Sequence, residues 1–224
     1  MAWNINDIYQ WTLKLMKKNQ AGGLNNIDFQ YHWNNSQAAY QDDLLGRFQK
    51  NNNGKEGINT GLIENETILD KLLPFTKPVT IPIVSAQAPK PGDWLYSLAL
   101  RINNNKVFKI THDSIWAVQQ DVIDPPSISD DSYYYSEYLN YYSILPSTAP
   151  SLDLDYISTV QQIAWGFTLD GNGRQVYDPS ASVQSLWDEN SNKEITSRML
   201  KTLGVAFKDQ DFAGFGQSVL TEGE

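Results

Sequence analysis

Cysteine is absent from this chain of 224 residues. Disulfides, thiolate nucleophiles and cysteine-ligated zinc sites are therefore excluded, since each needs the cysteine sulfur. Histidine is nearly as scarce, with His32 and His112 as the only two. Neither has a second histidine or a carboxylate at the spacing of a metal-binding helix, so we interpret both as structural or surface residues and expect no metal and no cofactor.

The chain also lacks long apolar runs. No stretch reaches the roughly 20 consecutive apolar residues that cross a bilayer. A secretory signal typically has a cationic segment followed by an apolar run. The opening residues, MAWNINDIYQW, have neither. We therefore expect a protein made in the cytoplasm that makes no contact with a membrane.

Charge is sparse and mostly of one sign. Lys and Arg number 17 against 26 Asp and Glu, which gives a formal net charge of -9. Binding to nucleic-acid phosphates depends on Lys and Arg, so this balance argues against a protein that grips DNA, although an acidic surface suits a channel in which DNA slides. Aromatic residues are 12 % of the chain. Because Tyr and Trp are enriched at buried interfaces, this favours a subunit of an assembly.

Helical periodicity marks both ends of the chain. An apolar stripe predicts a helix over 6–19, and a second helix begins at a cap provided by Asn25 or Asn26. Gly22 and Gly23 lie between these helices, which we expect to form an antiparallel hairpin. The stripes comprise Ile8, Tyr9, Thr12, Leu15, Met16 and Asn19 in the first helix, and Phe29, Trp33, Ser36, Tyr40 and Leu44 in the second.

Near the C-terminus, Ile195, Met199 and Leu203 lie at helical spacing. They predict a helix over 191–203 that stops at Gly204. A weaker helix is predicted over 210–220.

The middle of the chain has short apolar runs bounded by turn residues, which is typical of strands. Prolines at 74, 78, 82, 89 and 91 exclude a central strand there and favour an extended edge strand or a wandering segment. The Tyr-rich stretch over 127–150 predicts an extended excursion or a hairpin. Asp170-Gly171-Asn172-Gly173 predicts a tight turn between two paired strands, IAWGFTL and RQVY.

Together these patterns predict an α+β fold with four segments. We expect an N-terminal helical hairpin over 1–50, a flexible loop or arm over 51–61, a β-rich region with a Tyr-rich excursion over 62–180, and a C-terminal helical segment over 181–224. The C-terminal helix should pack on the hairpin, with the β-rich region inserted between them.

The Tyr cluster is the most unusual feature of the sequence. Successive strand residues point to opposite sides, so consecutive tyrosines cannot all face one core. Some rings then belong to the chain's own sheet, and others form a subunit contact or a stacking surface for sugar. The candidate interface residues are Tyr133, Tyr134, Tyr135, Tyr138, Tyr141, Tyr142 and Trp187.

Catalytic motifs are not evident. The pairs Asp42-Asp43 and Asp130-Asp131 could supply acid and base groups, but adjacent acidic residues are usually solvated. Asp170-Gly171-Asn172-Gly173 shares the start of a calcium-binding loop without its later glycine and glutamate, so we favour a hairpin turn. We expect no enzyme, and a carboxylate hydrolase remains a minor alternative.

Two stretches resemble a known family. The opening DIYQWTLKLMKKNQAGGLNNIDFQYHWNNSQAAYQDDL and the later VYDPSASVQSLWDENSNKEITSRMLKTLGV are similar to the virion ring proteins of crAss-like bacteriophages of Bacteroidetes hosts. Between them, DWLYSLALRIN and the hairpin IAWGFTLDGNG occupy the expected places. The chain departs from the family in lacking Tyr-Leu-x-x-Pro text before that hairpin, and its Tyr-rich segment is longer.

The resemblance implies a subunit of a head-to-tail connector, an adaptor ring that joins portal and tail in the virion. Such a ring would be a homo-oligomer, expected to be dodecameric, which binds the portal protein and other connector or tail proteins. Double-stranded DNA would pass through its lumen without specific binding. The alternative from the residues alone is a glycan-binding module that uses exposed Trp and Tyr.

Overall fold

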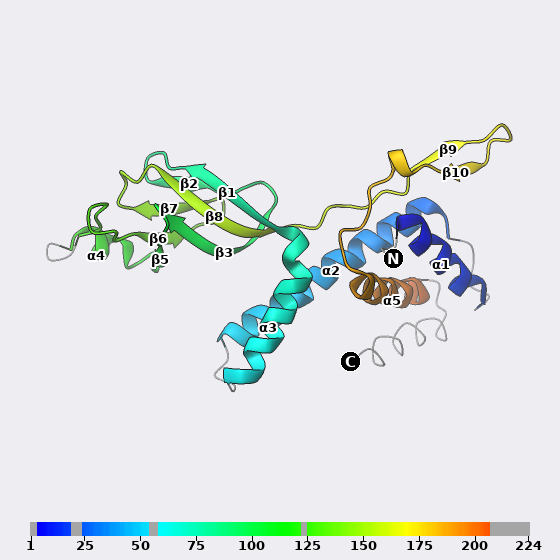
Figure 1. The fold of residues 1–224 in the computed structure, drawn as a ribbon, viewed down its shortest axis with the longest axis horizontal. Coiled ribbons are helices and arrows are strands. Elements are labelled where there is room, and N and C mark those ends of the chain that lie inside the picture. Colours follow the sequence, from blue (N-terminus) through cyan, green and yellow to red (C-terminus); the bar gives the residue numbers. More distant parts are fainter. Residues whose placement is uncertain (1–3, 19–23, 54–57, 122–124, 207–224) are drawn as a thin grey trace. The chain divides into compact units, whose positions relative to one another are not determined.

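The computed structural model describes residues 4–18, 24–53, 58–121 and 125–206. The chain forms two compact units (Figure 1). We call Met1–Pro74 together with Val160–Glu224 the helical unit, and Phe75–Thr159 the β unit. The predicted fold class is confirmed, since the chain is α+β with helices at the N-terminus, a strand-rich middle and a C-terminal helix.

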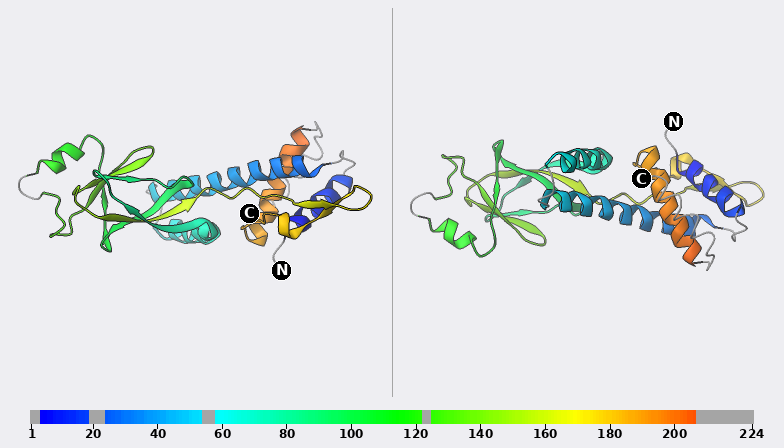
Figure 2. Two further views of the ribbon diagram at one scale, coloured as in Figure 1. Left: turned by 90° about the horizontal axis from the view of Figure 1, so that it is seen from above. Right: turned by 90° about the horizontal axis from the view of Figure 1, so that it is seen from below.

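The helical unit is built around one long helix. Its helices are α1 (Ile5–Lys18), α2 (Asn26–Asn53), α3 (Ile58–Leu72) and α5 (Glu189–Ala206), and a short 3-10 turn, η1 (Leu73–Phe75), follows α3. Helix α2 packs against both α3 and α5, and α1 packs against α5. Figure 2 shows α5 crossing α2 rather than running along it. The predicted packing of the C-terminal helix on the N-terminal helices is therefore confirmed.

The apolar stripes predicted for these helices are confirmed as the buried faces. All the predicted residues of α2 are buried, and in α1 the described members are buried except for half-buried Leu15. In α5, Ile195, Met199 and Leu203 are at most 1 % exposed. Burial of such stripes, rather than helix propensity, supplies most of the stability of helices in proteins.

Side-chain caps fix where the helices begin. The Asn25 side-chain oxygen accepts from the Asp28 backbone N–H at 2.7 Å, which confirms the predicted cap of α2. The Asp188 carboxylate accepts from the Ser191 N–H at 3.0 Å. Helix α5 accordingly begins at Glu189, two residues before the predicted start at residue 191. The predicted stop at Gly204 is wrong: α5 continues to Ala206, with Gly204 buried inside it.

Helix α3 was not predicted. The loop expected over 51–61 is wrong at both ends, because α2 continues to Asn53 and α3 begins at Ile58. Ile68 and Leu72 lie one turn apart and are buried, which anchors α3. The sequence before these two residues is rich in Asn and Gly, so their helical spacing was not recognised. Residues 54–57 and the whole helix predicted over 210–220 lie outside the described residues.

The β unit contains two four-stranded sheets. In the first, the order is β1 (Thr76–Pro82), β8 (Ser151–Ser158), β3 (Trp94–Ile102) and β4 (Asn105–Lys106), all antiparallel. Proline-bearing β1 pairs only with β8, through a register that runs from Thr76↔Ile157 to Pro82↔Ser151. The predicted edge strand is therefore confirmed.

The second sheet has the order β2 (Gln87–Pro89), β7 (Tyr141–Leu145), β6 (Tyr134–Glu137) and β5 (Phe108–Lys109). Its pairs are antiparallel except β5 with β6, which is parallel. Strands β6 and β7 form the hairpin of the Tyr-rich stretch, which was one of the two predicted conformations. A short helix, α4 (Ile115–Gln119), follows β5.

Both sheets contribute to one hydrophobic core. Strand β8 alternates buried and half-buried residues, placing Leu152, Leu154 and Tyr156 in this core, while Ile144 and Tyr142 enter it from β7. Period-two alternation of this kind buries one face of a sheet and leaves the other polar.

A small hairpin belongs to the helical unit. Strands β9 (Phe167–Leu169) and β10 (Gln175–Tyr177) are antiparallel, as predicted, and the 3-10 turn η2 (Pro179–Ala181) follows them. A hydrogen bond from the Gly173 N–H to the Asp170 carbonyl, at 2.9 Å, closes the turn between β9 and β10. Gly173 has a φ of +74°, a conformation that favours glycine.

Candidate functional site

The structure divides the predicted Tyr cluster between core and surface. Tyr133 and Tyr142 are 0 % exposed and belong to the core of the β unit. The Tyr142 hydroxyl lies 2.6 Å from the Ser97 hydroxyl, and the Tyr133 hydroxyl accepts from the Asn103 side-chain amide at 3.2 Å. Burial raises the pKa of Tyr142 to about 12, partly offset by the Ser97 hydrogen bond. These two rings pack inside the chain and present no face to a partner.

The other four tyrosines of the cluster are half-buried. Tyr138 and Tyr141 stack on each other with centroids 4.7 Å apart and planes 10° apart. Tyr135 meets the edge of buried Tyr142 at 5.9 Å, and Tyr134 lies 6.2 Å from Phe108. The prediction that consecutive tyrosines divide between two sides is confirmed, and only these four can contribute to a surface.

Trp187 does not join the tyrosines, because it belongs to the helical unit. It is 5 % exposed, and its ring meets Tyr40 edge-on with centroids 5.1 Å apart. Its inclusion in the predicted interface is corrected by this burial, since the indole packs within the chain's own helices.

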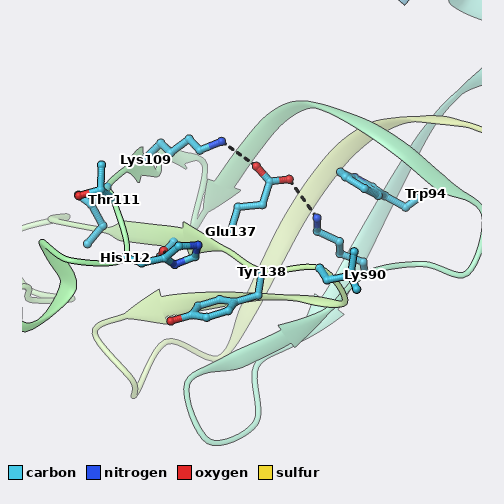
Figure 3. Close-up of a pocket in the computed structure, with 10 residues that line it drawn as sticks. Lys90, Trp94, Lys109, Thr111, His112, Glu137 and Tyr138 are labelled. Carbon is cyan, nitrogen blue, oxygen red and sulfur yellow. Dashed lines mark hydrogen bonds and ion pairs between the residues drawn. The ribbon is translucent and has the colours of Figure 1, made fainter. Parts of the chain in front are cut away.

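A pocket opens in the β unit beside the Tyr hairpin (Figure 3). Its volume is about 560 Å³, within the range of roughly 300–1,000 Å³ of small-molecule sites. Strand β6 and the residues after it provide one wall, and β5 with the residues after it another. The lining residues are Lys90, Trp94, Lys109, Ile110, Thr111, His112, Ser136, Glu137, Tyr138 and Leu139.

Three charged side chains meet in this pocket. Glu137 accepts from Lys90 through one carboxylate oxygen at 3.0 Å and from Lys109 through the other at 2.7 Å. The Lys90 side chain is only 6 % exposed, and its ammonium lies over the Trp94 ring, 3.5 Å from the centroid. A cation so placed is stabilised by the quadrupole of the ring. Figure 3 shows Glu137 between the two lysines.

These contacts shift the titration of the charged groups. Burial raises the pKa of Glu137, but the hydrogen bonds from Lys109 and Lys90 outweigh it, so this pKa lies below its ordinary value. The hydrogen bond to Glu137 raises the pKa of Lys109. Both shifts favour the charged forms of Glu137 and Lys109. Two lysines and one carboxylate give the cluster a formal net charge of about +1.

An imidazole lies on the other side of the pocket. Nδ1 of His112 is 2.6 Å from the Ser136 hydroxyl, and its ring centroid lies 4.3 Å from that of Tyr138. The imidazole is exposed, as predicted for a surface residue. If Ser136 donates to Nδ1, the proton of the neutral ring is on Nε2, which is then a donor.

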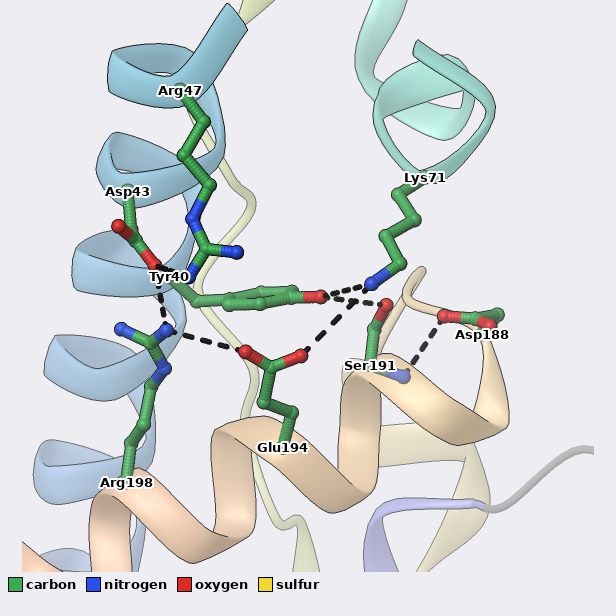
Figure 4. Close-up of polar contacts among 8 residues, drawn as sticks. All are labelled: Tyr40, Asp43, Arg47, Lys71, Asp188, Ser191, Glu194 and Arg198. Atoms are coloured by element: carbon green, nitrogen blue, oxygen red, sulfur yellow. Dashed lines mark hydrogen bonds and ion pairs between the residues drawn. The ribbon is translucent and has the colours of Figure 1, made fainter. Parts of the chain in front are cut away.

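A second polar cluster connects three helices of the helical unit (Figure 4). Tyr40 of α2 is 1 % exposed. Its hydroxyl accepts from Lys71 of α3 at 3.2 Å and lies 3.3 Å from the Ser191 hydroxyl of α5. The ring thus spans from its own helix to two others.

Arg198 of α5 completes this cluster. It donates to Asp43 at 2.7 Å and to Glu194 at 3.2 Å, and its guanidinium lies 5.2 Å from the centroid of the Tyr40 ring. Burial raises the pKa of Asp43, but the hydrogen bond from Arg198 and the charge of Arg47 lower it by more. The pKa of Asp43 therefore lies below its ordinary value. Asp43 is therefore an ion-pair partner between α2 and α5.

Sequence reasoning identified Tyr138 but missed the charged part of the pocket. Lys90, Lys109 and Glu137 lie far apart in sequence, and only the β5–β6 pairing and the turn after β2 bring them together. No local sequence pattern predicts such a cluster. Within the described ranges, no group of three or more His, Asp or Glu side chains is placed to hold a metal ion.

None of the helices in the described part of the chain is long and apolar enough to cross a membrane. Comparison with protein-family models finds no matching family, and comparison with curated proteins finds no match.

Proposed function

We propose that this chain is a structural subunit of a phage head-to-tail connector, an adaptor ring that joins portal and tail and extends the DNA channel. Two stretches of the chain, 7–44 and 176–205, resemble such ring proteins, and the proposal depends on where they lie in the fold. They are far apart in sequence, yet α2 and α5, which contain most of them, pack together in one unit. A resemblance carried by segments that share a packed core is more consistent with a common fold than one scattered over a chain.

Exposed apolar side chains support assembly. Ile27 and Tyr31, on one face of α2, are 71 % and 64 % exposed, and in the β unit Trp116 and Leu139 are 67 % and 86 % exposed. A closed ring with head-to-tail contacts needs two different surfaces on every subunit. Apolar groups exposed on both units provide candidates for two such surfaces.

The acidic balance suits a channel. A net charge of -9 gives little attraction for phosphates, so double-stranded DNA would pass the lumen without specific binding. The partners would be further copies of the chain, in a dodecameric ring, together with the portal protein and other connector or tail proteins. The location would be the virion.

The test is co-expression with the portal protein from the same genome, followed by native mass spectrometry and electron microscopy. The expected result is a ring of many copies bound to the portal. The double variant Ile27→Ser/Tyr31→Ser should weaken this assembly, whereas Asn35→Ser, at an exposed polar site on the same helix, should not. A chain that stays in single copies at every concentration, with and without the portal, contradicts the proposal.

A glycan-binding module is the second candidate, and the pocket of the β unit favours it. Aromatic rings, a carboxylate and amines around a hollow of about 560 Å³ are the groups that hold small polar ligands. Calorimetric titration with saccharides tests this candidate independently of ring assembly.

A further inference from the structure

The pocket of the β unit contains a buried charge, the ammonium of Lys90. The Lys90 side chain is 6 % exposed, so its ammonium has lost much of its hydration, and Glu137 and Trp94 offset that loss. Buried ion pairs usually give no more stability than apolar residues of the same size. A charged cluster at a pocket therefore points to a ligand rather than to the stability of the sheet.

The pocket is richer in hydrogen-bond donors than in acceptors. An ammonium has three N–H donors and no acceptor. Lys109 gives one hydrogen bond to Glu137 and has a side chain that is 61 % exposed, so it can donate further. Both oxygens of Glu137 already accept from a lysine. A ligand that fits such a site carries acceptors, and a carboxylate accepts up to four hydrogen bonds.

The charge of the pocket sets the charge of the ligand. Two lysines and one glutamate leave a net charge of about +1 on a chain whose net charge is -9. A single carboxylate neutralises this excess. A phosphate dianion would exceed it, and its second charge would increase the repulsion from nearby Glu137, which a carboxylate meets with one charge only.

The remaining walls fit a ring-shaped body. Tyr138 and Leu139 follow Glu137 at the end of β6, and Leu139 is 86 % exposed at the rim. His112 is held against Tyr138 by its contact with Ser136. The Tyr138 ring already stacks on Tyr141 and contacts His112, so an amphipathic ring with hydroxyls would place its C–H groups against Leu139 and the edge of Tyr138, and its acidic group toward Lys109.

We propose that this pocket binds an acidic saccharide, a uronic or sialic acid residue, with its carboxylate on Lys109 and His112 and its ring beside Tyr138 and Leu139. Lys90 and Glu137 are positioning residues, which hold Lys109 in place. The inference rests on the glycan-binding candidate above and adds the ligand class and the residues that select it.

The experiment is isothermal titration calorimetry of the full chain with three probes: a glucuronate-containing disaccharide, the same disaccharide with its carboxyl group reduced, and benzoate. N-acetylneuraminate is a fourth probe for the sialic acid arm. The acidic saccharides should bind at least about tenfold more tightly than the reduced one, as expected for a charge-assisted hydrogen bond. Raising the salt concentration should weaken binding, because Lys109 is exposed.

Two variants locate the site. Lys109→Gln should weaken binding of the acidic saccharide about tenfold, while the matched control Lys106→Gln, at an exposed lysine outside the lining, should change it less than about twofold. The His112 imidazole signals should shift in NMR spectra during the titration. Thermal unfolding of Lys106→Gln should match that of the original chain, and Lys109→Gln should be only slightly less stable, because Lys109 is exposed and Glu137 keeps Lys90 as a partner.

The outcomes separate the inference from the candidate function on which it rests. Equal binding of the reduced disaccharide overturns the carboxylate preference and leaves glycan binding standing. Absence of binding by every saccharide overturns both. Equal binding of benzoate overturns the saccharide body, and an unchanged affinity of Lys109→Gln overturns the location.

Discussion

The helical unit and the β unit each place cations against aromatic rings, but the surroundings of the two clusters differ. In the helical unit, Arg198 and Lys71 reach Tyr40 from two other helices. In the β unit, Lys90 lies over Trp94, and its partner Glu137 faces an open pocket together with Lys109. Similar ion-pair chemistry thus joins helices in one unit and lines a pocket in the other.

Exposure distinguishes the two clusters. Arg198 is 25 % exposed and is engaged by two carboxylates, whereas Lys109 is 61 % exposed and has one. The cation of the helical cluster is thus held between two carboxylates and stabilises packing, whereas Lys109 is exposed, has one carboxylate partner and can bind a further acceptor. Substitutions in the two units should therefore differ in what they affect.

The largest expected effect is on the core of the helical unit. Phe29 is 0 % exposed and contacts Tyr9 and Trp33, with centroids 4.9 and 6.0 Å away. Phe29→Ala should lower the free energy of unfolding by about 3–5 kcal/mol, because it leaves a cavity. Urea unfolding followed by far-UV circular dichroism measures it. The counterpart in the β unit, Ile144→Ala, should cost about 2–4 kcal/mol, and a loss below about 1 kcal/mol in either would contradict the assigned core.

An intermediate effect is expected from the buried lysine of the pocket. Lys90→Met removes one partner of Glu137 and the cation over Trp94. Breaking a buried pair costs about 3–5 kcal/mol when the other charge is left alone, but Glu137 retains Lys109, so we expect about 1–2 kcal/mol. Thermal unfolding measures this loss. Lys106→Met, at an exposed lysine, is the control, and equal losses in both variants would show that Lys90 is not held as described.

Acid should weaken both clusters, by less than the substitution of Lys90. The pKa values of Glu137 and Asp43 lie below their ordinary values of 4.5 and 3.8. A lowered folded-state pKa contributes stability that is present above the ordinary value and is lost as the pH falls through the folded value. Urea unfolding over a series from about pH 6 downward should therefore show a loss that Glu137→Gln and Asp43→Asn each reduce. A pH slope that neither variant changes would exclude these carboxylates as its cause.

Sequence periodicity predicted the helical unit well because its signals are local. The stripes of α1, α2 and α5 each lie within one segment, and an asparagine cap marks the start of α2. Helix α3 was missed because the sequence before Ile58 is polar and predicted a loop. Two apolar residues at helical spacing, Ile68 and Leu72, indicate the helix, and both are buried. Gly204 was misleading as a stop, since a buried glycine can remain inside a helix when tertiary packing outweighs its low propensity.

The β unit was harder to predict because its structure depends on distant pairings. Strand β8 was missed, although SLDLDYIS alternates strictly at its start and pairs with both β1 and β3. The hairpin of the Tyr stretch and the edge position of β1 followed from local signals. The pocket did not, because parallel pairing of β5 with β6 brings Lys109 beside Glu137, and no local pattern encodes such a contact.

The smallest expected effect lies in the β9–β10 hairpin of the helical unit. Gly173 has a φ of +74°, so Gly173→Ala should destabilise the turn by about 1 kcal/mol. Gly171→Ala is the matched control two residues earlier, where an added methyl group meets nothing within 4 Å and no positive φ is required. Thermal unfolding and the NMR signal of the Gly173 N–H, which donates to Asp170, measure the difference. Because this hairpin carries no part of either charged cluster, neither variant should alter ligand titration of the pocket, and equal effects of the two alanines would contradict the turn geometry.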